Sequence, residues 1–290
     1  MLPLESVPNF SEGRDRATID AIGAALSGHA DLLDVHTDVD HNRSVFTLVG
    51  DEQELADALL AGVAVAIERI DLRSHAGAHP RVGAADVLPI VPLEPGDLDR
   101  ARELAAVVGA RIGFELDLPV FVYAPPERGP AFYRRGGPTR LQERIDAGEV
   151  AVDFGPARLH ESAGGVILGA RAPLIAFNVN LRGTLETARE IAAVVRERGG
   201  GFPGVRALGL DLPSAGLVQV SMNVEDWEAA PLTDIVARIA AEAEARGATV
   251  AASELVGLLP AGALAAAARG ALRLDGLDAS SVLEARLAER

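Results

Sequence analysis

The sequence predicts an α+β protein built from two ferredoxin-like subdomains, each a β-α-β-β-α-β unit, with facing sheets and helices on the outside. The chain has 290 residues, which is more than a single compact core usually holds. Its hydrophobic share of 49% and its charged share of 24% are typical of a globular protein. One order of strands and helices occurs twice along the chain, and we place the boundary between residues 170 and 171.

Apolar residues of the first half recur at the spacing that is typical of strands or of helices. The polar turn after the first apolar run contains Ser11, which we expect to be the N-cap of the first helix. The elements expected in order are a strand at 4–8, a helix at 15–26, strands at 30–35 and 43–49, a helix at 51–70, a strand at 86–91, a helix at 100–114 and a strand at 120–123.

Residues 125–149 differ from their surroundings because they are rich in Pro, Gly and Arg and show little apolar periodicity. We expect a surface excursion there, with one short helix near 138–145. The apolar pattern then returns at Ala172, and the order of elements repeats. The elements expected in the second half are strands at 174–178, 205–212, 217–223 and 249–255, helices at 184–198 and 230–246, and a helical tail at 261–290 that packs on that half.

The composition argues against several classes of protein. There is no cysteine, so neither a disulfide nor a thiolate metal site can form, which fits a cytoplasmic protein. The formal net charge is −15 and no basic stripe interrupts it, so we expect no nucleic-acid partner. The sequence begins without a secretory signal pattern, and no apolar run approaches the roughly 20 residues that span a bilayer. Lysine is absent too, so fixed side-chain cations are arginines.

The chemistry of the chain is concentrated just after the long helix of the first half, where two histidines and an arginine crowd one segment. His75 and His79 are four residues apart, a spacing that would put both on one face of a helix. Gly77 and Pro80 argue against a helix, because glycine weakens one and proline cannot lie in its interior. We therefore expect a loop that leaves the helix near Arg73 and displays both histidines, as loops between rigid elements often display reacting groups.

A second group of polar residues precedes this loop in the sequence. Asp34, His36, Asp38 and Asp40 alternate along an extended segment, so their side chains could line one face. Together with the nearby histidines they could bind zinc or a hard metal ion. The same residue types also cap and turn chains, and we favour this structural interpretation.

Uncharged polar residues also alternate along two expected strands of the second half. Asn178 and Asn180 share one face of the first, and Gln219, Ser221 and Asn223 share one face of the other. An ordinary solvent-facing sheet surface is one interpretation. Solvent-facing surfaces usually carry charges, however, so we favour a surface that binds a ligand.

Six segments, spread over nearly the whole chain, resemble the formiminotransferase (glutamate formimidoyltransferase) domain of the formiminotransferase-cyclodeaminase family. Because several long blocks are involved, the resemblance is specific. The segments are VPNFSEGR at 7–14, DHNRSVFTLVG at 40–50, HAGAHPRVGAADVLPIVPL at 75–93, DFGP at 153–156, GARAPLIAFNVNL at 169–181 and SELVGLLP at 253–260.

The resemblance implies two ferredoxin-like subdomains, a cytoplasmic homodimer, and transfer of a formimino group from N-formimino-L-glutamate to N5 of tetrahydrofolate in histidine degradation. Tetrahydrofolate would be a co-substrate, with no bound cofactor and no metal. The form implied is a stand-alone one without a cyclodeaminase domain, so a separate protein would process the product.

The resemblance also implies roles for particular residues. His79 corresponds to the catalytic histidine of the family's His-Pro-Arg motif. An acidic residue of the animal enzyme aligns with His36, and Asp38 or Asp40 could take its place. The implied folate-binding segment comprises Gly155, Pro156, Ala157, Arg158, Leu159, His160, Glu161, Ser162, Ala163 and Gly164. The candidates for binding substrate are Asn9, Asp38, Asp40, Arg43, Arg81, Asn178 and Asn180, with Arg158 and Arg171 as further partners for carboxylates.

A neutral imidazole with an ordinary pKa near 6.5 can take the proton that N5 loses and return it to the departing glutamate nitrogen. Three alternatives stay open at this point. The same site could transfer a formyl group, the histidine and aspartate cluster could serve a metal-dependent hydrolase, or the paired subdomains could be a non-catalytic module that binds an amino acid or folate.

Overall fold

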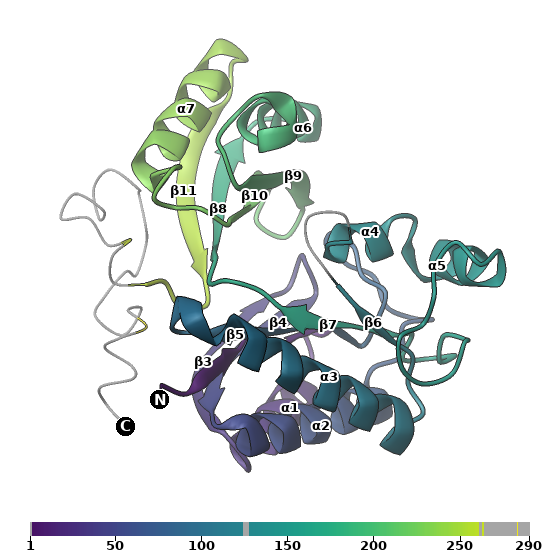
Figure 1. The fold of residues 1–290 in the computed structure, drawn as a ribbon. Coiled ribbons are helices and arrows are strands. Elements are labelled where there is room, and N and C mark those ends of the chain that lie inside the picture. Colours follow the sequence, from purple (N-terminus) through teal and green to yellow (C-terminus); the bar gives the residue numbers. More distant parts are fainter. Residues whose placement is uncertain (1, 124–127, 261–262, 264–282, 284–290) are drawn as a thin grey trace. The chain divides into compact units, whose positions relative to one another are not determined.

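The computed structural model describes residues 2–123, 128–260, 263 and 283. The chain divides into two compact units, the first ending at Pro173 and the second beginning at Leu174. Each unit contains one sheet and its own helices (Figure 1). The predicted α+β class is thus confirmed. The tail expected at 261–290 lies almost entirely outside the described residues.

The second unit is a four-stranded antiparallel sheet in the order β11-β8-β10-β9. Its first strand, β8, therefore lies between the third and the fourth, which is the ferredoxin-like arrangement. Helix α6 packs on β9 and β10, and α7 packs on β11 and β8. The elements are β8 (Ile175–Arg182), α6 (Leu185–Val195), the 3₁₀ turn η2 (Glu197–Gly199), β9 (Val205–Leu212), β10 (Leu217–Val224), α7 (Leu232–Ala245) and β11 (Thr249–Val256).

The first unit repeats this order and extends it. Strands β1 and β2 both pair with β4 and β5, so they act as one strand that is interrupted at Val7 and Pro8. The sheet then continues past β5 through β7 to β6, and these two added strands run parallel to β5. The elements are β1 (Leu4–Ser6), β2 (Asn9–Phe10), α1 (Arg16–Ser27), β3 (Asp31–Asp38), β4 (Arg43–Gly50), α2 (Glu52–Arg69), β5 (Ala85–Pro92), η1 (Pro95–Asp97), α3 (Leu98–Glu115), β6 (Val120–Val122), α4 (Pro130–Arg134), α5 (Gly137–Asp146) and β7 (Val166–Ala170).

Three local predictions are wrong. Ser11 does not cap the first helix; its hydroxyl donates to the carbonyl of Gly83, and Asp15 is the N-cap, accepting from the backbone of Ala17. The loop that carries the histidines leaves its helix at Arg69 rather than near Arg73, although the range of 51–70 predicted for α2 itself is close to the observed bounds. The excursion at 125–149 holds two helices, α4 and α5, rather than one.

Helices cover both faces of the first unit's sheet at its β7–β6 end. Helices α1, α2 and α3 pack on one face, around a core that includes Phe46 and Leu88. On the opposite face, Tyr133 of α4 and Leu141 of α5 pack with Phe121 and form a separate small core (Figure 1). The helices α4 and α5 are thus an addition to the predicted layer of outer helices at this end of the sheet. The rest of that opposite face, over β1, β2, β4 and β5, is called the open face below.

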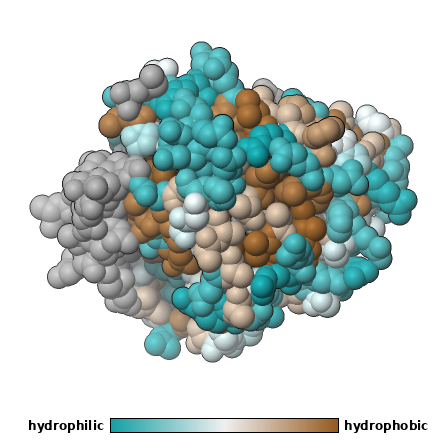
Figure 2. Space-filling view, turned by 90° about the horizontal axis from the view of Figure 1, so that it is seen from below, coloured by the Kyte–Doolittle hydropathy of each residue, from teal (hydrophilic) through white to brown (hydrophobic). Residues whose placement is uncertain are grey.

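The outer surface of the α1–α3 layer carries exposed apolar residues. Figure 2, a view from below Figure 1, shows apolar residues gathered near the middle of this side with hydrophilic residues around them. On α3, the side chains of Val107 and Phe114 are 53% and 92% exposed. Among the described helices, none combines the length and the hydropathy needed to cross a membrane.

Candidate active site

The loop that carries the two histidines is held in place by backbone contacts on both sides. Ala78 donates its backbone N–H to the carbonyl of Asp40 at 2.9 Å, and Ala84 donates to Ala163 at 2.8 Å. At Gly77, an added Cβ would lie 2.3 Å from the carbonyl oxygen of His41. Only glycine allows this close approach without movement of the backbone. The predicted loop is thus confirmed, and it is pressed against the turn between β3 and β4.

Asn42 links that turn to the histidine loop. Its backbone is left-handed, with φ of 48°, a conformation that asparagine tolerates better than most residues. The side-chain oxygen accepts from the backbone of Gly13 at 2.9 Å, and the side-chain amide donates to the carbonyl of Ala76 at 3.1 Å. The turn between β3 and β4 therefore fixes the position of the histidine loop at Ala76, before the chain enters β5.

Arg81 links the histidine loop to the turn between β3 and β4 through hydrogen bonds to the backbone of both. Its guanidinium donates to the backbone carbonyls of His41 and His79, both at 2.8 Å, and to that of Asn42 at 3.1 Å. It also lies 2.6 Å from Nδ1 of His75. Burial and the charge of Arg81 lower the pKa of His75 to about 4, so this imidazole is a neutral hydrogen-bond acceptor at pH 7.

The imidazole of His79 has two neighbours at the same nitrogen. Nδ1 lies 2.8 Å from the carbonyl oxygen of Pro80 and 3.1 Å from Nη1 of Arg43. The carbonyl can only accept and the guanidinium can only donate, so Nδ1 serves one of them at a time. When Nδ1 carries the proton and donates it to Pro80, Nε2 keeps a free lone pair. This tautomer is the one that can act as a base.

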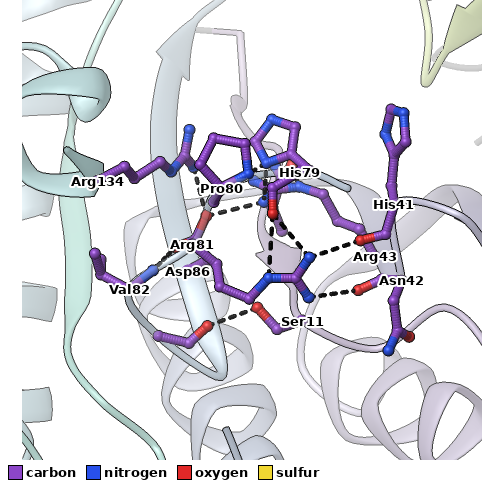
Figure 3. Close-up of polar contacts among 12 residues, drawn as sticks. Ser11, His41, Asn42, Arg43, His79, Pro80, Arg81, Val82, Asp86 and Arg134 are labelled. Carbon is purple, nitrogen blue, oxygen red and sulfur yellow. Dashed lines mark hydrogen bonds and ion pairs between the residues drawn. The ribbon is translucent and has the colours of Figure 1, made fainter. Parts of the chain in front are cut away.

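Behind His79 lies a buried group of ions (Figure 3). Arg43 donates from Nη1 to Asp86 Oδ2 at 2.9 Å and from Nε to Asn9 Oδ1 at 2.8 Å. Arg134, at the end of α4, places its Nη2 2.6 Å from the same Asp86 oxygen. The other oxygen of Asp86 accepts the backbone N–H of Val82 at 2.8 Å. The Asp86 side chain is fully buried, so its charge is neutralised by these contacts alone.

The electrostatics of the cluster favour a neutral imidazole and bound anions. Burial first, and then the charges of Arg43 and Arg134, lower the pKa of His79 well below 6.5. Burial opposes the ionisation of Asp86, but the two arginines outweigh it and lower the pKa of this carboxyl. Arg43 stays charged at pH 7, since burial lowers its pKa only to about 10. Three guanidinium groups, counting Arg81, thus face one carboxylate.

Of the candidates for binding substrate, Asn9, Arg43 and Arg81 lie around His79. Asp38 and Asp40 lie beside the loop. The Asp38 carboxylate accepts the backbone N–H of His41 at 2.6 Å, and the backbone carbonyl of Asp40 accepts the N–H of Ala78. Asn178 and Asn180 belong to the second unit. There, Asn178 donates to Glu254 at 3.0 Å, and Asn180 accepts from Gln219 at 2.9 Å, so the polar residues of that sheet bond to one another.

The segment 155–164 is an irregular stretch that ends beside the start of β5. Gly164 forms a bridge with Gly83, and a Cβ on it would lie 2.0 Å from the carbonyl oxygen of Val82. The Nδ1 atom of His160 accepts the backbone N–H of Ala163 at 3.1 Å and stabilises the turn. The segment implied to bind folate is therefore bonded to the residues between His79 and β5 and lies in the same unit.

Two charged residues of the cluster were not singled out from the sequence. Asp86 counted only as the first residue of a strand, although a carboxylate that opens an otherwise apolar strand is a weak signal of function. Arg134 lies within 125–149, where the sequence predicts a surface excursion. The described residues also contain no group of three or more histidine, aspartate or glutamate side chains placed to hold a metal ion, so the metal interpretation gains no support.

An α+β protein of two ferredoxin-like units that sets a neutral imidazole among guanidinium groups has the parts for acid–base chemistry on anionic substrates. Sequence comparison names the class more closely. Residues 3–171 match the family model described as the formiminotransferase domain, N-terminal subdomain, and residues 176–279 match the formiminotransferase domain. The chain belongs to the formiminotransferase family and is a transferase.

Three relatives show how far this similarity extends. A glutamate formimidoyltransferase from Streptococcus pyogenes is 38% identical, over 95% of each chain. Another, from Thermoplasma acidophilum, is 39% identical over 98% of this chain and 97% of its own. A formimidoyltransferase-cyclodeaminase from Rattus norvegicus is 38% identical, over 91% of this chain but only 51% of its own length. The similarity to the two microbial transferases is thus end to end.

Proposed function

We propose that this protein transfers the formimino group of N-formimino-L-glutamate to N5 of tetrahydrofolate, with His79 as the general base. The names of the relatives support the reaction. The observation that carries the role of His79 is the hydrogen bond between Nδ1 and the carbonyl of Pro80, which leaves Nε2 free to accept a proton.

The reaction requires one proton to be moved twice. N5 of tetrahydrofolate attacks the formimino carbon and forms a tetrahedral intermediate. The proton of N5 passes to Nε2 of His79, which becomes an imidazolium with Nδ1–H still directed at Pro80. When the intermediate collapses, the bond between the formimino carbon and the glutamate nitrogen breaks, and the imidazolium returns the proton to that nitrogen. The products are 5-formiminotetrahydrofolate and glutamate, and tetrahydrofolate is a co-substrate.

The positive cluster supports binding of both substrates, since each carries carboxylates. Arg43 and Arg134 share a single counter-ion, Asp86, so their summed charge is only partly neutralised. An anion bound nearby would raise the pKa of His79 and make it a stronger base once the complex forms. We place the folate along 155–164, as the resemblance implies, and we expect the active form to be a cytoplasmic homodimer.

The test is turnover of N-formimino-L-glutamate with tetrahydrofolate by the purified protein, with the products identified by chromatography and mass spectrometry. The His79→Ala variant should fold but lose about 10²- to 10⁴-fold of the rate, the usual contribution of acid–base catalysis. His29→Ala, an exposed histidine at the end of α1, is the matched control and should keep the rate.

Three parallel reactions separate this proposal from its alternatives. N-formyl-L-glutamate as donor distinguishes formyl from formimino transfer. Sensitivity to a chelator would point to a metal-dependent hydrolase, and absence of turnover with either donor to a binding module. A His79→Ala variant as fast as the parent protein would remove His79 from the mechanism.

A further inference from the structure

The open face of the first unit's sheet carries a row of side chains that reaches from the His79 cluster to β1. On β4, Phe46 and Leu48 point into the helix-side core, so the alternate residues Val45 and Thr47 point to the open face. Asn9 pairs with Val45 and with Val87, and it shares their face.

Glu5 lies on this face, at the centre of the sheet. It pairs with Val49 of β4 and Val91 of β5, and it is only 7% exposed. Among the described residues, no hydrogen bond or ion pair reaches its carboxylate. Burial raises the pKa of Glu5 to about 7, against the opposing charge of Arg171. A carboxyl group in the middle of a sheet without a partner is costly unless a ligand supplies one.

A second polar atom on the same face also lacks a partner. Thr47 is 1% exposed, and its hydroxyl makes no hydrogen bond in the described structure. Thr47 is two residues from Val49, which lies directly opposite Glu5, so Thr47 and Glu5 are diagonal neighbours. Glu5 and Thr47 thus place an acceptor beside a hydroxyl that can both donate and accept, and neither has a hydrogen-bond partner among the described residues.

The spacing between this pair and the His79 cluster fits a flat ligand. Thr47 and Arg43 are four residues apart on β4, which corresponds to about 13 Å along a strand. The sheet surface between them includes Val45 and Val87, both apolar and nearly buried. A planar ring system of about this length would reach from Glu5 at one edge to His79 at the other.

We infer that Glu5, assisted by Thr47, binds the 2-amino-4-oxopyrimidine edge of the pterin ring of tetrahydrofolate. That edge presents two adjacent N–H donors, from N3 and from the 2-amino group, and a carboxylate accepts such a pair through its two oxygens. The opposite part of the ring carries N5, which this orientation turns toward His79. The inference rests on the proposed function and assigns the residue that orients its co-substrate.

The experiment compares the binding of tetrahydrofolate with that of its 2-desamino analogue, by calorimetry under reducing conditions. The parent protein should prefer tetrahydrofolate by about 10- to 100-fold, as expected for a hydrogen bond to a charged group. Glu5→Gln should lose most of this preference, because an amide offers one acceptor where two are needed. Glu103→Gln, an exposed glutamate on α3, is the matched control and should retain it.

Thr47→Val provides a second test that does not touch the carboxylate. If Thr47 contacts the ligand, its replacement should weaken tetrahydrofolate binding about 2- to 10-fold without lowering the thermal midpoint, since the hydroxyl has no partner in the free protein. Full preference in a folded Glu5→Gln variant, or unchanged binding by Thr47→Val if Glu5→Gln does not fold, would overturn the inference. A parent protein that binds no tetrahydrofolate would contradict the proposed function instead.

Discussion

The Nδ1 atom of His79 lies between a hydrogen-bond acceptor and a hydrogen-bond donor, which favour opposite protonation states of this nitrogen. The carbonyl of Pro80 favours a protonated Nδ1, and the guanidinium of Arg43 favours an unprotonated one. Because Arg43 is already engaged by Asp86 and Asn9, it can give up the contact with His79 without losing its other partners. The imidazole can therefore take and return a proton at Nε2 while the surrounding cations stay in place.

The pH dependence of the reaction follows from this environment. In the free enzyme the pKa of His79 lies well below 6.5, and a general base is active when it is unprotonated. We therefore expect kcat/KM to fall only at a pH well below 6.5. Bound carboxylates offset the nearby guanidinium charges and raise the pKa, so the acid limb of kcat should lie at higher pH than that of kcat/KM. Steady-state rates between pH 4.5 and 8 measure both limbs. An acid limb of kcat/KM above pH 6.5 would show that burial and the guanidinium charges do not control this imidazole.

At the scale of elements, the predictions succeed where the apolar period is regular. Strand β10 alternates clearly and α2 has both a capping box and a long apolar stripe, so both were found close to their observed bounds. Strand β7 was missed because Val-Ile-Leu-Gly-Ala is a short continuous apolar run, the pattern of a parallel strand buried on both faces. Periodicity alone does not distinguish such a run from a buried segment of helix.

The ion cluster could not be predicted from the sequence for a different reason. Asp86 and Arg134 are brought together only because α4 folds over the β7–β6 end of the sheet, on the side of the open face. The chain has 27 basic residues, all of them arginine, and nothing in their spacing marks the one that reaches Asp86. His79 and its loop were predictable, since Gly77 and Pro80 determine local backbone geometry. The partners of His79 depend on tertiary packing.

The histidine loop itself gives a test at this scale. Gly77→Ala would place a methyl group 2.3 Å from the carbonyl of His41 and 2.5 Å from Nη2 of Arg81, so the loop must shift. A displacement near 1 Å at a reacting group can cost about 100-fold, and we expect kcat/KM to fall by about 10- to 100-fold. Gly96→Ala is the matched control, because nothing lies within 4 Å of the added atom. Equal activities of the two variants would show that the loop tolerates movement.

At the scale of the whole molecule, two separate cores stabilise the two units. Phe46 is fully buried among the helices of the first unit, and Phe177 is fully buried in the second. The duplication of one strand order accounts for this, because the antiparallel part of each sheet buries one face under helices of its own unit. The single tryptophan, Trp227, packs on the second core only, so its fluorescence reports the unfolding of that unit.

We therefore expect the two cores to respond separately to truncation. Phe177→Ala should lower the free energy of unfolding followed by Trp227 fluorescence by about 3–5 kcal/mol, the usual cost of removing a buried ring. Phe46→Ala should leave that transition in place and shift the circular dichroism change that belongs to the first unit. Urea titrations followed by both signals make the comparison, with Val107→Ala on the exposed face of α3 as a control that should move neither. Coincident shifts of both signals in Phe46→Ala would mean that the units unfold as one cooperative body.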